Sequence, residues 1–251
     1  MAFDPSLKRF YDDNGYVIVE RVFTDAELAP LRNRTDEMVR DPSTATKGVR
    51  VGRESETQQP KLGEKPPAVD PIRKFEGTVR FDPIFQDFAR QPKLHELVRG
   101  LIGPRIKIFR DQMLLKPPGG QDKPTHQDQS YFRVQPMDGL VTAWVALDDA
   151  TLDNGCMKYV PGSHKFGILE MHPDPERPVH HVPKTDGLNL PPEVACPVPA
   201  GSIIFHHGLT LHRSGVNNTQ TWRKALILHF ATSDAKSDIG PLNKEISMII
   251  D

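Results

Sequence analysis

Cysteine, net charge and long apolar runs are all scarce in this chain of 251 residues. The two cysteines, Cys156 and Cys196, do not form a Cys-x-x-Cys pair, so a disulfide framework is excluded and we expect a reducing compartment, the cytoplasm. The longest uncharged apolar run, 140–147, is far shorter than a bilayer span, and the first residues lack the basic and apolar regions of a signal peptide. We therefore expect no association with a membrane.

Charge of neither sign is in excess, because 32 lysines and arginines stand against 33 aspartates and glutamates. A net charge of −1 gives no general attraction to phosphate backbones, so nucleic acid is not an expected partner. Proline and glycine, in contrast, are frequent, with 24 and 18 residues. They indicate many turns and short elements rather than a bundle of long helices. The oligomeric state cannot be read from the sequence.

The first part of the chain, residues 1–104, has mainly helical patterns. Residues 6–14 and 25–39 predict helices on either side of a short strand, and 92–102 has its apolar side chains on one face between a first-turn proline and a Gly-Pro stop. Residues 41–71 are polar and rich in Pro, Gly, Ser and Thr, without a sustained period. A segment of this length and composition predicts a lid over a functional site.

The second part, residues 105–251, consists of short β-rich runs separated by turn residues. The predicted strands are 106–116, 140–147, 157–160, 194–198, 202–206 and 224–232. Since the sequence has no repeats and no clear internal boundary, we expect one domain over 1–251, mainly β, with the helices packed on one side. A closed or sandwich-like antiparallel barrel is the natural architecture, and its mouth offers a ligand cavity.

Two His-x-Asp/Glu tripeptides occur, both with aspartate, where composition alone predicts about one. His172-Pro173-Asp174 lies among prolines and is best explained as a solvated turn. His126-Gln127-Asp128 follows a Gly-Gly turn and precedes a run that can extend as a strand. On a strand, residues two apart point to the same face, so His126 and Asp128 could both bind one metal ion.

A third ligand should come from a distant strand, and the candidates are His206, His207, His212 and His229. His206 and His229 could equally be hydrogen-bonded core histidines. His212 is favoured because Arg223 follows eleven residues later and could return beside it across a hairpin, offering a bidentate fork to a carboxylate. Two histidines and one carboxylate form the facial triad of non-haem Fe(II) oxygenases, and the arginine would then hold the far carboxylate of 2-oxoglutarate.

These residues amount to a family resemblance. The stretch 106–232 resembles the phytanoyl-CoA dioxygenase family of Fe(II)/2-oxoglutarate-dependent oxygenases, and 11–16 is similar to that family's opening. The matching pieces are Met113-Leu114-Leu115-Lys116-Pro117-Pro118, His126-Gln127-Asp128, Trp144, Asn154-Gly155-Cys156, Pro161-Gly162-Ser163-His164, and His212-x-Ser214-Gly215-x-Asn217 followed by Arg223. The resemblance implies a double-stranded β-helix, the jelly-roll or cupin-like fold.

The resemblance also implies roles for single residues. His126, Asp128 and His212 would bind Fe(II), Arg223 would bind the distal carboxylate of 2-oxoglutarate, and Ser214 would form a hydrogen bond nearby.

Three further residues would complete the co-substrate site. Trp144 would form a wall of this pocket, unless it is an ordinary core aromatic. Gln112 would contact 2-oxoglutarate, unless it is simply an inward polar side chain. Lys74 matches a co-substrate-binding lysine only with a one-residue gap, and a solvated lysine is the alternative.

The expected activity is hydroxylation of a C–H bond in a small organic substrate, an acyl-CoA or a secondary metabolite, with release of succinate and CO₂. Related halogenases lack the carboxylate ligand and bind chloride instead, so Asp128 favours oxygenation. The substrate cannot be named from the sequence, and desaturation, epoxidation or ring formation are other outcomes of this chemistry. We expect the 41–71 lid and the insertion 167–192 to exclude water.

Two alternatives belong to other classes. One is a non-catalytic barrel that binds a metal or a small molecule, and the other is a cupin-like metal enzyme that does not use 2-oxoglutarate. The combination of Arg223 with the three predicted ligands argues against both. The insertion also contains His172, His180 and His181, which we expect to be surface histidines rather than a second metal site.

Overall fold

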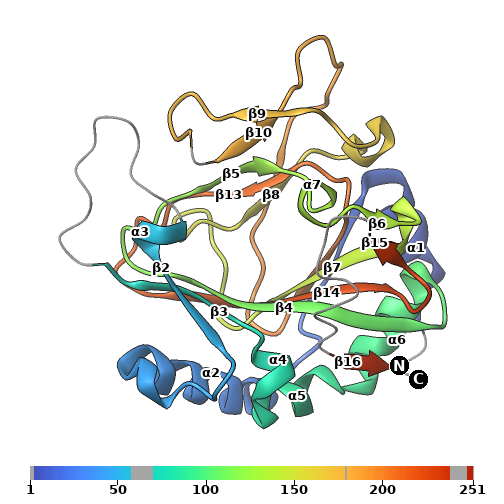
Figure 1. Cartoon of the computed structure of the whole chain (residues 1–251). Coiled ribbons are helices and arrows are strands. Elements are labelled where there is room, and N and C mark those ends of the chain that lie inside the picture. Colours follow the sequence, from blue (N-terminus) through green and yellow to red (C-terminus); the bar gives the residue numbers. More distant parts are fainter. Residues whose placement is uncertain (1–2, 58–69, 179, 238–247, 251) are drawn as a thin grey trace.

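The computed structural model describes residues 3–57, 70–178, 180–237 and 248–250. Two antiparallel sheets face each other, and helices cover the outer side of the larger sheet (Figure 1). Among the described residues, no helix has both the length and the apolar character needed to cross a membrane.

The larger sheet has the strand order β1-β12-β7-β14-β4-β3-β2, with β16 paired to β4 beside this path. Its strands are β1 (Tyr16–Val19), β2 (Arg50–Arg53), β3 (Ile72–Glu76), β4 (Ile106–Lys116), β7 (Leu140–Ala146), β12 (Ile203–His207), β14 (Arg223–Thr232) and β16 (Met248–Ile250). The smaller sheet has the order β11-β8-β13-β5 and lies opposite (Figure 1). Its strands are β5 (Lys123–His126), β8 (Met157–Tyr159), β11 (Val194–Cys196) and β13 (His212–Ser214).

Two small ribbons complete the strands. They are β6 (Val134–Gln135) with β15 (Lys236–Ser237), and β9 (Met171–Pro173) with β10 (His181–Pro183). The second ribbon lies in the expected 167–192 insertion, on the outer side of the smaller sheet (Figure 1). His172 lies in β9 and is not among the residues that line the cavity between the sheets.

The helices precede most of the strands, as the sequence predicts. They are α1 (Pro5–Asn14), α2 (Asp25–Arg40), α3 (Glu54–Thr57), α4 (Thr78–Phe81), α5 (Pro83–Ala89), α6 (Pro92–Ile102) and α7 (Gln129–Phe132), with 3-10 turns at Pro42–Thr44, Met137–Gly139 and Ser163–Phe166. Thr24 and Glu27 form a capping box at the start of α2, and Gly15 ends α1 with a φ of 78°. These local signals explain why the predicted helix boundaries agree closely with the structure.

Side-chain alternation in the larger sheet separates the core from the cavity. In β7, Val141, Ala143 and Val145 belong to the main core against the helices. The intervening Thr142 and Trp144 face the smaller sheet and line the cavity. Because side chains alternate along a strand, one central strand can serve a dry core and a polar site together.

The expected lid, 41–71, is partly regular structure, which differs from the prediction. Within it, β2 pairs with β3 at the edge of the larger sheet, preceded by a 3-10 turn and followed by α3. Gly52 lies in β2, and three of the four β2 residues are exposed, so the strand has no continuous apolar pattern that the sequence could reveal. Residues 58–69 of the expected lid lie outside the described part of the chain.

Candidate active site

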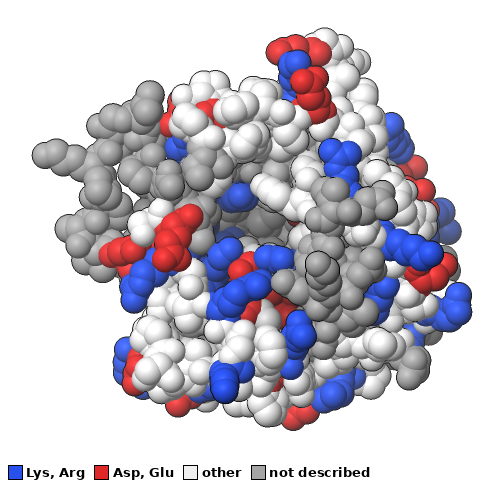
Figure 2. Space-filling view, viewed as in Figure 1, with Lys and Arg blue, Asp and Glu red and all other residues white. Residues whose placement is uncertain are grey.

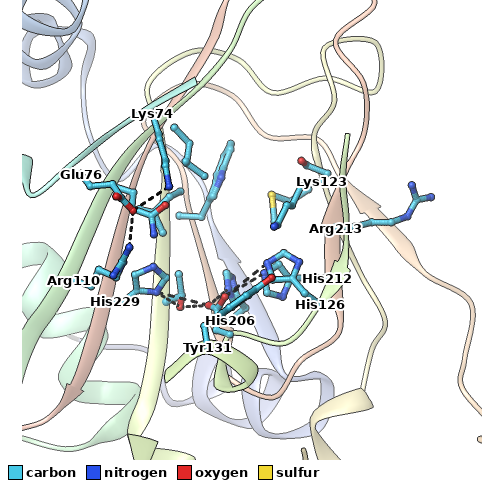
Figure 3. A pocket seen from close by; sticks show the side chains of 18 of the residues that line it. Lys74, Glu76, Arg110, Lys123, His126, Tyr131, His206, His212, Arg213 and His229 are labelled. Carbon is cyan, nitrogen blue, oxygen red and sulfur yellow. Dashed lines mark hydrogen bonds and ion pairs between the residues drawn. The ribbon is translucent and has the colours of Figure 1, made fainter. Parts of the chain in front are cut away.

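A cavity of about 410 Å³ lies between the two sheets. The face of the molecule shown in Figure 2 is hollowed here, and lysine and arginine side chains gather around the opening. In Figure 3, Lys74, Glu76, Arg110 and His229 lie on the wall formed by the larger sheet, and Lys123, His126 and His212 lie on the opposite wall.

Three predicted ligands meet in this cavity. His126, Asp128 and His212 are buried, and one donor atom from each lies within 4.8 Å of the others. The Asp128 Oδ1 atom is 3.9 Å from His126 Nε2 and 3.7 Å from His212 Nε2. Two imidazole nitrogens and one carboxylate oxygen form the donor set typical of a mononuclear Fe(II) site with open positions, so these residues fit the expected metal.

The local backbone around His126 differs from the expected strand. β5 ends at His126, and Asp128 has helical dihedral angles at the start of the short helix α7. Asp128 therefore reaches the same site through a turn and not through strand alternation. Gln127, between them, is fully buried, and its side-chain amide donates to the carbonyl oxygens of Gly167 and Leu209, which anchors this turn.

The hydrogen bonds of both histidines leave Nε2 free for a metal. Nδ1 of His126 lies 2.8 Å from the Pro124 carbonyl oxygen, and Nδ1 of His212 lies 2.9 Å from the Thr210 carbonyl oxygen. A carbonyl oxygen can only accept, so Nδ1 carries the proton in each ring and Nε2 presents its lone pair. Burial lowers the pKa of His126 well below its usual value and that of His212 to about 4, which keeps both rings neutral.

The second oxygen of Asp128 is held by two donors. Thr142 Oγ1 donates to Asp128 Oδ2 at 2.6 Å, and His206 Nε2 donates to it at 3.0 Å. Although burial acts to raise the pKa of Asp128, the hydrogen bond from His206 and the proximity of His212 bring it well below the usual range. The carboxylate is thus ionised and fixed in orientation, with Oδ1 facing the two ligand histidines.

Two further side chains support these donors. Tyr159 Oη lies 3.0 Å from His206 Nδ1, and His229 Nδ1 lies 3.0 Å from Thr142 Oγ1. Since the Thr142 proton goes to Asp128, His229 Nδ1 donates to the threonine oxygen. His206 and His229, left open between ligand and core roles by the sequence, are here buried hydrogen-bonding partners that support the Asp128 carboxylate.

Arg223 enters the cavity from the larger sheet. It pairs in register with Lys116 of β4, whereas His212 lies in the smaller sheet, so the two are not neighbours across a hairpin as expected. One guanidinium nitrogen donates to the Gly155 carbonyl at 3.1 Å, and its buried Nε has no partner among the described residues. Burial, and then Arg73, lower the pKa of Arg223 to about 9. A buried cation without a carboxylate partner is suited to an anionic ligand.

Ser214 and Lys116 lie beside this arginine. The Lys116 ammonium donates to Ser214 Oγ at 3.0 Å and to the Gly215 carbonyl oxygen. Burial and the charge of Arg223 lower the pKa of Lys116 well below its usual value. Lys116 is fully buried, and the sequence indicated it only as part of the Lys-Pro-Pro match.

The remaining predicted residues also line the cavity. Trp144 has the Arg223 guanidinium 5.2 Å from its ring centroid, and its indole N–H has no partner among the described residues. Gln112 lies in β4, opposite Ile227 of β14. Lys74 is ion-paired with Glu76 at 3.2 Å, which differs from a solvated lysine. Their contacts with 2-oxoglutarate stay predictions.

Comparison with known proteins identifies the family. The family model for phytanoyl-CoA dioxygenase (PhyH) matches residues 11–225. A probable phytanoyl-CoA dioxygenase of Caenorhabditis elegans is 28% identical over 240 residues, which cover 90% of this chain and 75% of the relative. The peroxisomal phytanoyl-CoA dioxygenase of Homo sapiens is 29% identical over 237 residues, which cover 90% of this chain and 68% of the relative.

Solved structures agree on the fold. The non-haem α-ketoglutarate-dependent carbocyclase SnoK from nogalamycin biosynthesis superposes with a TM-score of 0.72 at 23% identity and covers 99% of this chain and 94% of its own. The epimerase SnoN, in complex with Fe³⁺, α-ketoglutarate and nogalamycin RO, has a TM-score of 0.73 at 22% identity. The superposition covers 95% of this chain and 88% of the SnoN chain. The cupin-like double-sheet fold is confirmed, and the chain belongs to the phytanoyl-CoA dioxygenase family of Fe(II)- and 2-oxoglutarate-dependent oxygenases, whose cofactor set is Fe(II), 2-oxoglutarate and O₂.

Proposed function

We propose that this protein hydroxylates an unactivated C–H bond of a small organic substrate, with conversion of 2-oxoglutarate to succinate and CO₂. One observation carries the proposal: a buried cluster of His126, Asp128 and His212 shares its cavity with Arg223, a buried cation that lacks a carboxylate partner among the described residues. The presence of Asp128 favours oxygenation over halogenation, because a carboxylate takes the position that a halide would need.

Different residues of the cavity would bind the metal and the co-substrate. His126, Asp128 and His212 would hold Fe(II), while Arg223 would pair with the distal carboxylate of 2-oxoglutarate and Ser214 would hydrogen-bond beside it. When bound, iron and 2-oxoglutarate supply the activation of O₂ and the removal of hydrogen from the substrate. The buried position of the cluster limits access of water to this chemistry.

Two substrate classes have support. The names of the curated relatives favour an acyl-CoA. The enzymes from nogalamycin biosynthesis among the structural neighbours favour a secondary metabolite. In either case the reacting part of the substrate must fit a cavity of about 410 Å³ together with 2-oxoglutarate, which is at the small end of ligand-binding pockets.

Anaerobic titration with Fe(II) and then 2-oxoglutarate tests the proposal. The bidentate chelate has a weak visible charge-transfer band, and we expect this band with the unmodified protein. His126→Ala should abolish it, and Arg223→Ala should raise the half-saturating concentration of 2-oxoglutarate roughly 10- to 100-fold while iron binding persists, because a charge-assisted pair is lost. His172→Ala is the matched control, since this histidine belongs to the other His-x-Asp tripeptide.

The outcomes separate the alternatives. Tight iron binding without the band would favour the cupin-like or non-catalytic barrel. Loss of iron in His172→Ala would overturn the assignment of the ligands. For the reaction itself, a product that gains one oxygen atom from ¹⁸O₂ supports hydroxylation, whereas loss of two hydrogens without oxygen gain contradicts it.

The proposal includes a cytoplasmic location. Cys156 and Cys196 are both free and buried, which is compatible with a reducing compartment. Fractionation of the producing cells tests this, and recovery with a membrane or an exported fraction would contradict it.

A further inference from the structure

Six lysine and arginine side chains line the cavity, and four of them form ion pairs with three carboxylates. These pairs are Arg73 with Glu54, Lys74 and Arg110 with Glu76, and Arg213 with Glu193. The other two, Arg223 and Lys123, have no carboxylate partner within the described ranges. Since 2-oxoglutarate has one distal carboxylate, which would pair with Arg223, Lys123 is left as a second cation without an ion pair among the described residues.

A bulge in β5 turns Lys123 into the cavity. His126 lies opposite His212, and Lys123 lies opposite Ser214, so three steps along β5 match two steps along β13. In a regular strand, residues three apart point to opposite faces, but one extra residue restores the same face. Lys123 therefore points to the same side as the ligand His126, as Figure 3 shows.

Within the described ranges no carboxylate forms an ion pair with Lys123, although the charge of Asp128 acts to raise its pKa. Its ammonium lies 5.7 Å from the ring centroid of Tyr131, and the same ring lies 5.8 Å from His126. Burial, followed by the charges of Arg73 and Lys74, lowers the pKa of Lys123 to about 8. Taking an ammonium out of water without a counter-ion is costly, and an anionic ligand would recover this cost.

Lys123 and Arg223 lie on different walls of the cavity. Arg223 belongs to the larger sheet, beside Trp144. Lys123 belongs to the smaller sheet, beside Tyr131 and one residue pair away from the two ligand histidines. An anion held by Lys123 would thus lie on the wall formed by the smaller sheet, one residue pair from the ligand histidines and opposite Ser214, whereas the distal carboxylate of 2-oxoglutarate would pair with Arg223 of the larger sheet.

We propose that Lys123 binds an anionic oxygen group of the organic substrate, a carboxylate or a phosphate, and thereby selects acidic substrates and orients them beside the iron. This inference rests on the proposed function and narrows its substrate class. The charge-assisted hydrogen bond would fix one end of the substrate, so that a neighbouring C–H bond is presented to the metal.

Paramagnetic relaxation tests this proposal without the true substrate. The protein is loaded with Mn(II) and 2-oxoglutarate, and relaxation of the acetate methyl protons and of the phosphate ³¹P nucleus is measured, with the Zn(II) form as the diamagnetic reference. We expect at least one of the two ions to bind near the metal in the unmodified protein. Lys123→Met should weaken this binding roughly tenfold or more, and Lys123→Arg should retain most of it.

Three controls make the result specific. Lys165→Met removes the same charge from an exposed position and should leave anion binding unchanged. The Fe(II)–2-oxoglutarate band must persist in Lys123→Met with a similar half-saturating concentration, which shows that the fold and the proposed function survive. Lys123→Gln, which retains a hydrogen-bond donor, replaces the methionine variant if that variant does not fold.

Each outcome decides the proposal. Preference for acetate indicates a carboxylate substrate, and preference for phosphate indicates a phosphorylated one. Absence of anion binding, or equal relaxation in Lys123→Met caused by anions bound to the metal alone, would overturn it. A strongly raised 2-oxoglutarate requirement in Lys123→Met would also overturn it, because Lys123 would then serve the co-substrate. Absence of the band in the unmodified protein would instead be a failure of the proposed function.

Discussion

At the scale of single residues, the carboxylate of Asp128 divides its two oxygens between two tasks. Oδ1 faces the imidazoles of His126 and His212, and Oδ2 accepts hydrogen bonds from Thr142 and His206. A carboxylate that is fixed through one oxygen cannot rotate freely, so the other oxygen stays aimed at the metal position. Removal of a side chain that hydrogen-bonds to a metal ligand commonly lowers the affinity for the metal 10- to 100-fold.

Thr142→Val should therefore lower the affinity for Fe(II) by roughly 10- to 100-fold, since the valine has nearly the same shape but cannot donate to Asp128. Competitive titration against a metal-binding dye measures the affinity. Thr35→Val is the matched control, because Thr35 is fully buried in α2 and its hydroxyl has no partner among the described residues. Equal affinities in the two variants would remove Thr142 from the support of the site.

The ligands themselves could be predicted from the sequence, but the residues that hold them could not. His126-Gln127-Asp128 and the sequence around His212 are local patterns that can be found in the sequence alone. Thr142 and His206 reach Asp128 only because β7 and β12 are adjacent, with His206 directly opposite Thr142. Pairing between strands that are far apart in the sequence leaves no local signal, so these positions stay hidden until the fold is known.

At the scale of elements, the longest strands were predicted well, whereas several of the short ones were missed. β4, β7 and β14 have 11, 7 and 10 residues, and their predicted boundaries differ from the structure by at most one residue at either end. β3, β5 and β13 have only five, four and three residues and contain charged or histidine side chains. Their strand conformation comes from pairing with neighbours, which overrides weak local preference.

Gly155 connects one of these short elements to the co-substrate site. Its φ is 81°, and its carbonyl oxygen accepts from Arg223. A Cβ atom at this position would collide with the backbone carbonyl oxygen of Gly215, just after β13. The glycine is thus required both by its backbone conformation and by the close approach of another backbone segment.

Gly155→Ala should lower the free energy of unfolding by about 2–4 kcal/mol and raise the half-saturating concentration of 2-oxoglutarate, because the anchor of Arg223 shifts. Gly187→Ala separates the effect of backbone strain from that of a steric clash. Gly187 also has a positive φ, 78°, but no atom lies within 4 Å of the added Cβ. We expect it to cost only about 1–2 kcal/mol, without any change in the 2-oxoglutarate requirement. Denaturant unfolding and the charge-transfer titration provide the two measurements, and identical results for both variants would contradict this account.

At the scale of the whole molecule, the larger sheet supports two environments. Its outer face packs against helices through a continuous apolar cluster, while its inner face places polar and charged side chains in the cavity. Five histidines lie at or near this inner region: His126, His206, His207, His212 and His229. The stability of the core therefore offsets the cost of burying a concentrated set of ionisable groups.

This burial makes the metal-free protein sensitive to acid. Burial lowers the pKa of His207, His212 and His229 to about 4 each, whereas a histidine in an unfolded chain titrates near 6.5. Above pH 6.5 these rings are neutral in both states and contribute no pH dependence. Between about pH 6.5 and 4 the unfolded chain binds protons that the native protein does not, so stability falls as the pH falls.

Each such histidine adds a slope of about 1.4 kcal/mol per pH unit within that window. Urea unfolding of the chelator-treated protein at pH 7.5, 6.0, 5.0 and 4.5 measures it, and we expect a steady decline only below pH 6.5. His229→Phe should reduce the slope by about 1.4 kcal/mol per pH unit, the contribution of one proton. The phenyl ring fits beside Phe109 and Phe132 and takes up no proton in either state. A slope unchanged by this substitution would show that His229 already titrates in the native protein as it does in the unfolded chain, and that the carboxylate of Asp128, 3.8 Å away, compensates for its burial.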